Sequence, residues 1–290
     1  MKYLFSLLVL FSSLSIFAQL PSYVPTNGLV GYWPFNGNAN DESGNGNNGT
    51  VNGATLTTDR FGVANKAYSF NGVNNYINAG SNISFSNFTI STWVYMNANP
   101  TGLNALVSKI STNFQNFELA INPGINNPSL SWGNGSSWFG LNSSQTLPVA
   151  QWHHIVATYN SSNIMTLYFD GNVLLTSTAT SYSNVSGFET FFGARPNTQG
   201  ISSTTFFHNG KLDDIGIWNR ALTQQEITNL FTSSIPPVTC NITTTDSTLC
   251  LGESTTLTST APSSSNASFC TSASLPSNLQ TGLVGYWPFC

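Results

Sequence analysis

The segment 88–96, with the sequence FTISTWVYM, is the feature that most limits the fold. In an extended strand, Ile90 and Val94 share one face, whereas Trp93 and Tyr95 lie on the opposite face. A strand that is apolar on both faces has to be covered on both sides. This segment therefore predicts a central strand of stacked β-sheets.

A second region predicts three consecutive antiparallel strands. The apolar runs Trp152–Tyr159 and Ile164–Phe169 are joined by the polar turn 160–163, and Asp170-Gly171 then leads into 173–176. An Asp-Gly pair favours the tight turn of a β-hairpin. Together with the first segment, this pattern predicts an all-β domain.

The composition indicates a folded chain with an uncharged polar surface. Charged residues make up 6% of the chain, while 40% of residues are apolar and 13% aromatic. Disordered chains are poor in hydrophobic residues, so the surface is expected to consist of Asn, Ser, Thr and Gly, which favour turns and loops. With seven basic residues and a net charge of −4, the chain offers no basic patch for a phosphate backbone. We therefore expect no nucleic-acid partner.

The end of the large domain predicts its single helix. Thr223 is a candidate N-cap, and Glu226 three residues later completes a capping box. Leu222 and Ile227 take the positions of a hydrophobic staple. We expect a short C-terminal helix over 221–231, packed against the edge of the sandwich.

The first 18 residues predict a secretory signal peptide, which a lead-in over 19–27 follows. Lys2 supplies the positive charge, residues 3–17 are apolar apart from serines, and Ala18 is small enough for a cleavage site. An uncleaved N-terminal anchor is the alternative. No later stretch approaches the roughly 20 apolar residues that a membrane-spanning helix needs. We expect a secreted or cell-surface protein that is not inserted in the membrane once the signal is removed.

An octapeptide repeat sets the domain organisation. Gly-Leu-Val-Gly-Tyr-Trp-Pro-Phe occurs at 28–35 and again, unchanged, at 282–289. We expect one large domain over 28–232 and the start of a second, truncated copy over 275–290. The chain is then one part of a larger multi-domain protein.

A linker with partial strand character is expected between the two copies. It covers 233–274 and is rich in Pro, Ser and Thr, and its part 240–260 resembles the first two strands of an immunoglobulin-like module. Because an exported protein meets oxidising conditions, the four late cysteines are expected to form disulfides. They are Cys240, Cys250, Cys270 and Cys290. Of the three possible pairings, we favour Cys240 with Cys250 and Cys270 with Cys290, because each pair closes a short loop.

Eight short motifs follow one another along the large domain. They are GLVGYWPF at 28–35, DESGNG at 41–46, YSFNG at 68–72, FTISTW at 88–93, WHHIVA at 152–157, YFDG at 168–171, GKLDDI at 210–215 and NRAL at 219–222. In this order they resemble the LamG-like jelly-roll family of the concanavalin A-like lectin/glucanase superfamily. The resemblance covers essentially all of 28–231, and it implies a two-sheet antiparallel jelly-roll sandwich.

Acidic residues in two of these motifs suggest a cation site. Asp41 and Asn45 lie in a loop rich in Gly and Asn, and Asp213 and Asp214 lie at the start of a late strand. Calcium prefers roughly six to eight oxygen ligands from carboxylates, amides and backbone carbonyls. The resemblance implies a structural calcium ion at these residues, because related domains often bind calcium there. The alternative is that Asp41 only caps its own turn.

The carboxylates and histidines do not predict catalysis. A glycosidase needs two carboxyl groups about 5–9.5 Å apart, and Glu118 is the only glutamate on a predicted central strand. His153 and His154 point to opposite faces of one strand, so they cannot act as a pair. The sequence contains no nucleophile-elbow motif. We expect a protein that is not an enzyme, and the alternative is a glycoside hydrolase in which Glu118 meets a second carboxylate.

The segment 132–139 suggests a carbohydrate-binding loop. Trp132, Trp138 and Phe139 flank a turn of Gly, Asn and Ser, and lectin-like sites stack sugar rings on exposed aromatic side chains. The alternative is a hairpin whose tryptophans fill the core. We expect a non-catalytic binding or adhesion module for a glycan or a cell-surface or matrix ligand, with a structural spacer as the alternative.

Overall fold

The computed structural model describes residues 20–110, 116–178, 181–195 and 206–232, and the short strands within 242–244 and 257–259. The chain divides into two compact units, Met1–Pro236 and Pro237–Cys290. In the described part of the chain, no helix is long and apolar enough to cross a membrane.

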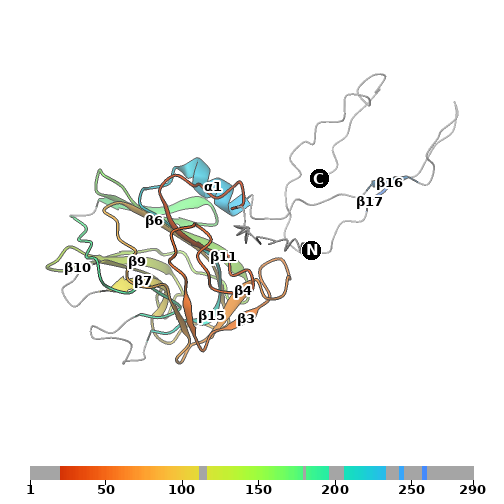
Figure 1. Ribbon diagram of the computed structural model, residues 1–290, viewed down its shortest axis with the longest axis horizontal. Helices are drawn as coiled ribbons and strands as arrows, with labels where there is room; N and C mark the ends of the chain where they lie inside the picture. Colours follow the sequence, from red (N-terminus) through yellow and green to blue (C-terminus); the bar gives the residue numbers. More distant parts are fainter. Residues whose placement is uncertain are drawn as a thin grey trace, which may run out of the picture. The chain divides into compact units, whose positions relative to one another are not determined.

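The first unit is a sandwich of two antiparallel β-sheets (Figure 1). One sheet has eight strands in the order β13-β12-β11-β6-β15-β4-β3, with β1 also paired to β15. Its strands are β1 (Leu29–Trp33), β3 (Thr55–Thr57), β4 (Ala67–Asn71), β6 (Phe88–Met96), β11 (Trp152–Tyr159), β12 (Ile164–Phe169), β13 (Asn172–Thr178) and β15 (Asn209–Trp218). The predicted meander is confirmed by β11, β12 and β13, which are consecutive neighbours.

The second sheet has seven strands in the order β10-β9-β8-β7-β14-β5-β2. Its strands are β2 (Thr50–Asn52), β5 (Tyr76–Asn78), β7 (Asn104–Ile110), β8 (Asn116–Ile121), β9 (Pro128–Gly133), β10 (Trp138–Asn142) and β14 (Phe191–Phe192). Two stacked antiparallel sheets confirm the predicted all-β jelly-roll sandwich.

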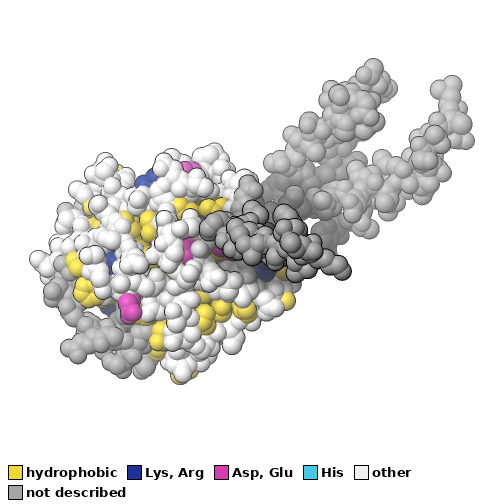
Figure 2. Space-filling view, viewed as in Figure 1, with side chains coloured by type: hydrophobic (Ala, Val, Ile, Leu, Met, Phe, Trp, Pro, Cys, Tyr) yellow, Lys and Arg dark blue, Asp and Glu magenta, His cyan; other side chains and the backbone are white. Residues whose placement is uncertain are grey.

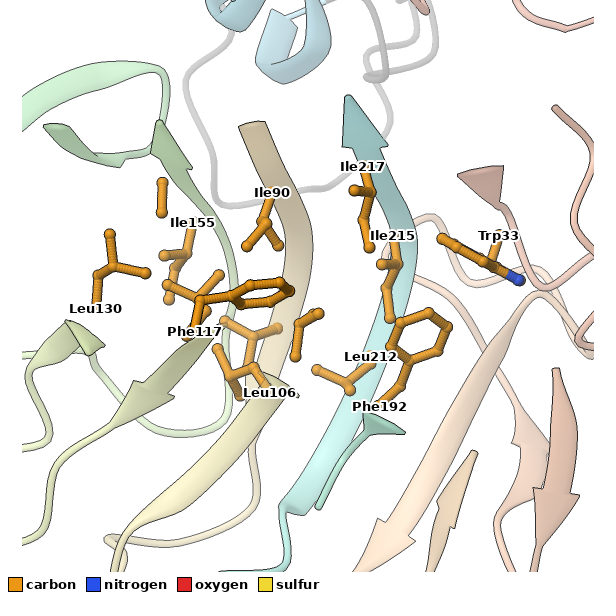
Figure 3. Packing of buried hydrophobic residues seen from close by; sticks show 14 of the residues in the cluster. Trp33, Ile90, Leu106, Phe117, Leu130, Ile155, Phe192, Leu212, Ile215 and Ile217 are labelled. Carbon is orange, nitrogen blue, oxygen red and sulfur yellow. The ribbon is translucent and has the colours of Figure 1, made fainter. Parts of the chain in front are cut away.

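Side chains from both sheets fill the space between them. Ile90 of β6 and Ile155 of β11 come from the eight-stranded sheet, and Leu106 of β7, Phe117 of β8 and Leu130 of β9 come from the other (Figure 3). All five are fully buried. Burying a side chain of this kind stabilises the fold by about 1.5–3 kcal/mol, so this layer is the main source of stability.

The outer face of the eight-stranded sheet is apolar as well. It is covered by the helix α1 (Gln224–Thr232) and by the N-terminal segment around Val24, which pack together with Trp218 of β15. Trp93 of β6 stacks on Phe231 of the helix, with 5.7 Å between ring centroids. The prediction that the helix packs against the sandwich edge is wrong, because the helix covers the second apolar face of β6 and its neighbours.

The capping box at the start of the helix is confirmed. The backbone NH of Thr223 donates to Glu226 Oε2 at 2.8 Å, and the backbone NH of Glu226 donates to Thr223 Oγ1 at 3.3 Å. Arg220 binds the other oxygen of Glu226 at 2.5 Å, and this contact is the main cause that lowers the pKa of Glu226 to about 2. The helix begins at Gln224, directly after the cap.

Uncharged polar side chains and backbone dominate the visible surface of the first unit, where acidic and basic groups are scattered (Figure 2). This agrees with the surface that the composition predicts.

The second unit contains a pair of short strands. β16 (Ile242–Thr244) pairs antiparallel with β17 (Leu257–Ser259), inside the region where two strands were expected. The signal peptide, the four cysteines and the second octapeptide lie outside the described residues, so the predictions made for them stay predictions.

Candidate functional site

Two adjacent aspartates of β15, Asp213 and Asp214, face the same side of the eight-stranded sheet. Successive side chains of a regular strand point to opposite faces, but the register of β15 with β6 shifts between Asp213 and Gly216. The core shows this shift, because Leu212 and Ile215 both point into it although they lie three residues apart. The bulge therefore turns both carboxylates outward. We expected the two aspartates at the start of the strand, but they lie in its middle.

Arg60, in the loop between β3 and β4, joins the two carboxylates. Its Nη1 lies 2.6 Å from Asp213 Oδ2, and its Nη2 lies 2.6 Å from Asp214 Oδ2. The guanidinium also lies 4.3 Å from the ring centroid of Phe61 and 4.7 Å from that of Trp93. Its side chain is only 6% exposed. The guanidinium is thus held by carboxylates and aromatic rings of the protein itself.

Burial and the charge of the ion-pair partner shift the pKa values in opposite directions within the cluster of Arg60, Asp213 and Asp214. Burial raises the pKa of Asp213 well above its ordinary value, and the neighbouring Asp214 charge raises it further, against the effect of Arg60. Burial alone would lower the pKa of Arg60, but the charges of Asp214 and Asp213 outweigh it and raise that pKa. Arg60 therefore stays charged at every physiological pH.

Tyr32 of β1 connects the cluster to the loop 41–48. Its hydroxyl donates to Asp214 Oδ1 at 2.7 Å, and its backbone NH donates to Asp41 Oδ1 at 3.0 Å. Burial and the Asp214 charge raise the pKa of Tyr32 well above its ordinary value. The hydroxyl therefore stays protonated and remains a hydrogen-bond donor.

Asp59 fixes the loop that presents Arg60. Its Oδ1 accepts hydrogen bonds from the backbone NH groups of Phe61 and Val63, both at 2.8 Å. Gly62 adopts a φ of +82°, a conformation that favours glycine. This local turn sets the position of Arg60 before any ligand is present.

A cleft of about 220 Å³ opens beside Arg60 on the outer face of the sheet. Its apolar wall includes Phe61 and Val63, which are 37% and 49% exposed. Its polar wall includes Asn36 and Lys66, where Lys66 Nζ donates to Asn36 Oδ1 at 2.6 Å. The cleft therefore combines an apolar surface with fixed polar groups, as small-molecule sites do.

The carboxylate of Asp41 is satisfied within its own loop. Its Oδ1 accepts from the backbone NH groups of Tyr32 and Ser43, and its Oδ2 accepts from that of Asn47 at 2.9 Å. Asn45 uses its amide nitrogen, which donates to backbone carbonyls of β1. The geometry agrees with the alternative in which Asp41 caps its own turn.

The four residues predicted to bind calcium do not fit a calcium ion in this geometry. Among the residues that the structure describes, no three His, Cys, Asp or Glu side chains are grouped so that they could hold a metal ion. The oxygens of Asp41 serve backbone NH groups, and Arg60 binds both Asp213 and Asp214. A dication requires many free oxygen ligands, and the guanidinium would repel it.

Of the three residues of the predicted aromatic platform, Trp132 is part of the core, whereas Trp138 and Phe139 are partly exposed. Trp132 is 4% exposed and belongs to the hydrophobic core cluster between the two sheets. Phe139 stacks on Trp132, with 5.8 Å between ring centroids, but it is only partly buried against this cluster. The prediction that Trp132 stacks on a sugar is therefore corrected, because its ring is buried between the sheets, while the prediction for Phe139 stays a prediction. Trp138 is half-buried and lies outside this cluster.

Glu118 is a buried carboxyl on β8. It is 3% exposed, and burial raises its pKa to about 7 against the opposing charge of Arg195, which lies 3.7 Å away. Its partners across the sheet are Ser108 and Ser131. These neighbours do not supply the second carboxyl that glycoside hydrolysis requires.

His154 and Ser91 form a hydrogen-bonded pair without room for a substrate. His154 Nε2 lies 2.8 Å from Ser91 Oγ, but Trp93 and Phe231 pack on the imidazole. The adjoining cavity measures only about 10 Å³, close to the space that one water needs. His153 lies on the opposite face, where it binds Asp170 at 2.9 Å.

Sequence reasoning missed the residues that build the cleft, notably Arg60, Tyr32 and Lys66. The small number of basic residues could have indicated them. The chain has only seven, so each was a candidate partner for the acidic pair Asp213 and Asp214.

A jelly-roll sandwich of two antiparallel sheets is the architecture of lectin-like domains. The profile of the Concanavalin A-like lectin/glucanases superfamily matches residues 71–228, more than half of the chain. The chain belongs to this superfamily, in its laminin G-like branch. The match includes Asp213 and Asp214 but begins after Arg60. Comparison with curated protein sequences gives no match.

Three solved structures illustrate the shared fold. The binding domain of Paraclostridial Mosquitocidal Protein 1 aligns with a TM-score of 0.60 and 22% identity, over 75% of this chain and 54% of that one. Domain 4 of AbnA, an extracellular arabinanase from Geobacillus stearothermophilus, in complex with arabinotriose, aligns with a TM-score of 0.56 and 19% identity, over 70% and 97%. The ligand binding domain of botulinum neurotoxin serotype D, in complex with N-acetylneuraminic acid, gives 0.57 and 18%, over 73% and 52%. The chain spans about half the length of the first and third, and these identities show the fold alone.

Proposed function

We propose that this chain is an exported, non-catalytic module that binds a glycan in the cleft beside Arg60. The observation that carries the proposal is the pairing of an exposed apolar wall with polar groups held in fixed positions. A sugar ring presents C–H groups on its faces and hydroxyls on its edge, so it suits a wall of each kind. Two of the related structures hold arabinotriose and N-acetylneuraminic acid, which supports a glycan as the ligand class.

The way in which the carboxylates are used supports binding rather than hydrolysis. Asp213 Oδ1 accepts the backbone NH of Asp214, and its Oδ2 accepts from Arg60. Asp214 accepts from Arg60 and from Tyr32. Both carboxylates are therefore fixed by the protein, and neither is placed to donate a proton to a glycosidic oxygen, as a general acid must.

Trp138 offers a second candidate surface. It stands at the start of β10, half-buried and outside the main core cluster. An aromatic ring in this position can add a stacking contact for a longer glycan. Trp138→Ala tests this contact separately from the cleft.

The proposed setting is a larger exported protein. The leader over 1–18, the late cysteines and the repeated octapeptide support secretion, disulfides and tandem copies. Linked weak sites gain affinity through effective concentration, so an array would bind a surface glycan more tightly than one module does. This proposal needs no calcium ion, because Arg60 supplies the positive charge between Asp213 and Asp214.

The experiment is a glycan array followed by calorimetric titration of the full mature chain. We expect Kd values in the micromolar to millimolar range, and a loss of about tenfold in affinity for Lys66→Gln or Asn36→Ala. Glu189→Gln is the control, because Glu189 is an exposed carboxylate outside the cleft, where it accepts a hydrogen bond from Asn78 of the seven-stranded sheet. Absence of binding would support the spacer alternative, and a glycan affinity that neither cleft variant changes from that of the unmodified chain would place the ligand elsewhere.

A further inference from the structure

We propose that the cleft selects an uncharged saccharide unit and excludes units that carry a carboxylate or a sulfate. This inference rests on the proposed glycan binding and names its ligand class. It follows from how each charge that lines the cleft is already used.

Arg60 cannot serve as the receptor for an anion. Its two terminal nitrogens bind Asp213 and Asp214 at 2.6 Å each. Phe61 and Trp93 pack within 4.3 and 4.7 Å of the guanidinium. A ligand carboxylate would have to displace one of these buried contacts to form the bidentate pair that arginine usually offers anions.

Lys66 is the remaining basic residue of the cleft, and its environment is acidic. Its ammonium donates to Asn36 Oδ1 at 2.6 Å, and the Asn36 amide donates in turn to Glu42 Oε1 at 3.4 Å. Asn36 therefore links the Lys66 ammonium to the carboxylate of Glu42. This hydrogen-bond network of Lys66, Asn36 and Glu42 presents donors and acceptors together, which suits a sugar hydroxyl better than an anion.

The formal charge of the lining is not positive. Two basic residues, Arg60 and Lys66, stand against three acidic ones, Asp59, Asp213 and Asp214. With Asp213 protonated the balance is neutral, and with Asp213 ionised it is negative. In both cases an anionic ligand gains no net attraction, and it meets the carboxylates of Asp59 and Asp214 at short range.

Neutral hydroxyls find complementary partners in the same cleft. An ionised carboxylate has about four acceptor sites, so the lining carboxylates can accept a further hydrogen bond from a sugar hydroxyl, while Lys66 donates to such hydroxyls. The exposed parts of Phe61 and Val63 provide an apolar surface for the C–H face of a sugar ring. The cleft thus distinguishes sugars by charge, although one structural relative of the same fold binds the acidic sugar N-acetylneuraminic acid.

The test uses the full mature chain and matched pairs of saccharides that differ only in charge. Suitable pairs are glucose- and glucuronate-terminated oligosaccharides, and galactose- and galacturonate-terminated oligosaccharides. We expect the neutral member of the bound pair to have a Kd at least about tenfold lower. The preference should narrow as salt rises, because salt screens repulsion between charges.

Asp59→Asn is the sharpest variant, because asparagine keeps the Oδ1 acceptor that holds the loop. We expect it to reduce the neutral-to-acidic preference by about threefold, while the control Glu189→Gln leaves the preference unchanged. Equal or tighter binding of the acidic member would overturn this inference and leave the proposed function intact. Failure to bind either member of any pair would overturn the proposed function and the inference with it.

Discussion

Two groups of carboxylates in this domain, Asp41 in its loop and the pair Asp213 and Asp214 on β15, differ in the source of their partners. Asp41 binds three backbone NH groups, two of them within six residues of it. The pair on β15 depends on Arg60, which is more than 150 residues away in sequence. The first arrangement is a local turn, whereas the second forms only when the whole sandwich is assembled. The comparison shows why identical side chains have different consequences for stability.

Loss of the distant partner should have the largest effect. Arg60→Met leaves two buried carboxylates without their cation, so we expect it to lower the free energy of unfolding by about 3–5 kcal/mol. Urea denaturation of the full chain measures this loss. Arg195→Met is the control: its side chain is 29% exposed beside Glu118, and we expect a change of about 1 kcal/mol or less. Equal losses in the two variants would contradict the comparison.

Loss of the local acceptor should have a smaller effect. Asp41→Ala leaves three backbone NH groups without their acceptor and should lower the free energy of unfolding by about 2–3 kcal/mol. Asp41→Asn keeps one oxygen for Tyr32 and Ser43 and should cost about 1 kcal/mol. The same denaturation experiment compares both. A larger loss for Asp41→Ala than for Arg60→Met would reverse the ranking.

Acid should lower the free energy of unfolding through the buried His154. Burial first, and the Arg60 charge second, lower the pKa of His154 to about 3 from 6.5. The unfolded chain takes up this proton below about pH 6.5 while the folded chain does not, so stability is complete above that pH and declines as pH falls toward 3. The decline due to His154 should reach about 2 kcal/mol at pH 5. Denaturation midpoints measured from pH 7 to 4 check this, and His154→Asn should make the decline shallower. An unchanged slope in that variant would assign the decline to other groups.

Calcium should have the smallest effect. The oxygens of both carboxylate groups are occupied by protein donors, so we expect the melting temperature to change by less than about 1 °C between excess calcium and excess chelator. Differential scanning fluorimetry of the full chain measures it. A rise of several degrees with calcium would restore the cation site that the family resemblance implies.

The sequence predicted those features that depend on neighbouring residues. The strand 88–96, the meander from Trp152 and the cap at Thr223 each follow from short-range patterns, and all three are present. For Asp41, capping of its own turn was the alternative interpretation, and a calcium site was the prediction. Local geometry is readable in the sequence because its partners are close in the chain.

The cleft was not predictable in this way. The bulge at Asp213 changes which face a side chain occupies, and it left no clear signal beyond the spacing of Leu212 and Ile215. Arg60 is brought to that bulge by the pairing of β4 with β15, a contact that depends on the whole topology. The inward rotation of Trp132 likewise depends on packing between the two sheets.

One wall of the cleft comes from the first described residues of the chain. Pro21 and Tyr23 line it, and Val24 packs with Trp218 beneath the helix. If export removes residues 1–18, the new amino terminus is only a few residues from the cleft. A purification tag or carrier protein joined at that end would sit next to the binding surface, so material for binding measurements should carry its tag at the carboxyl terminus.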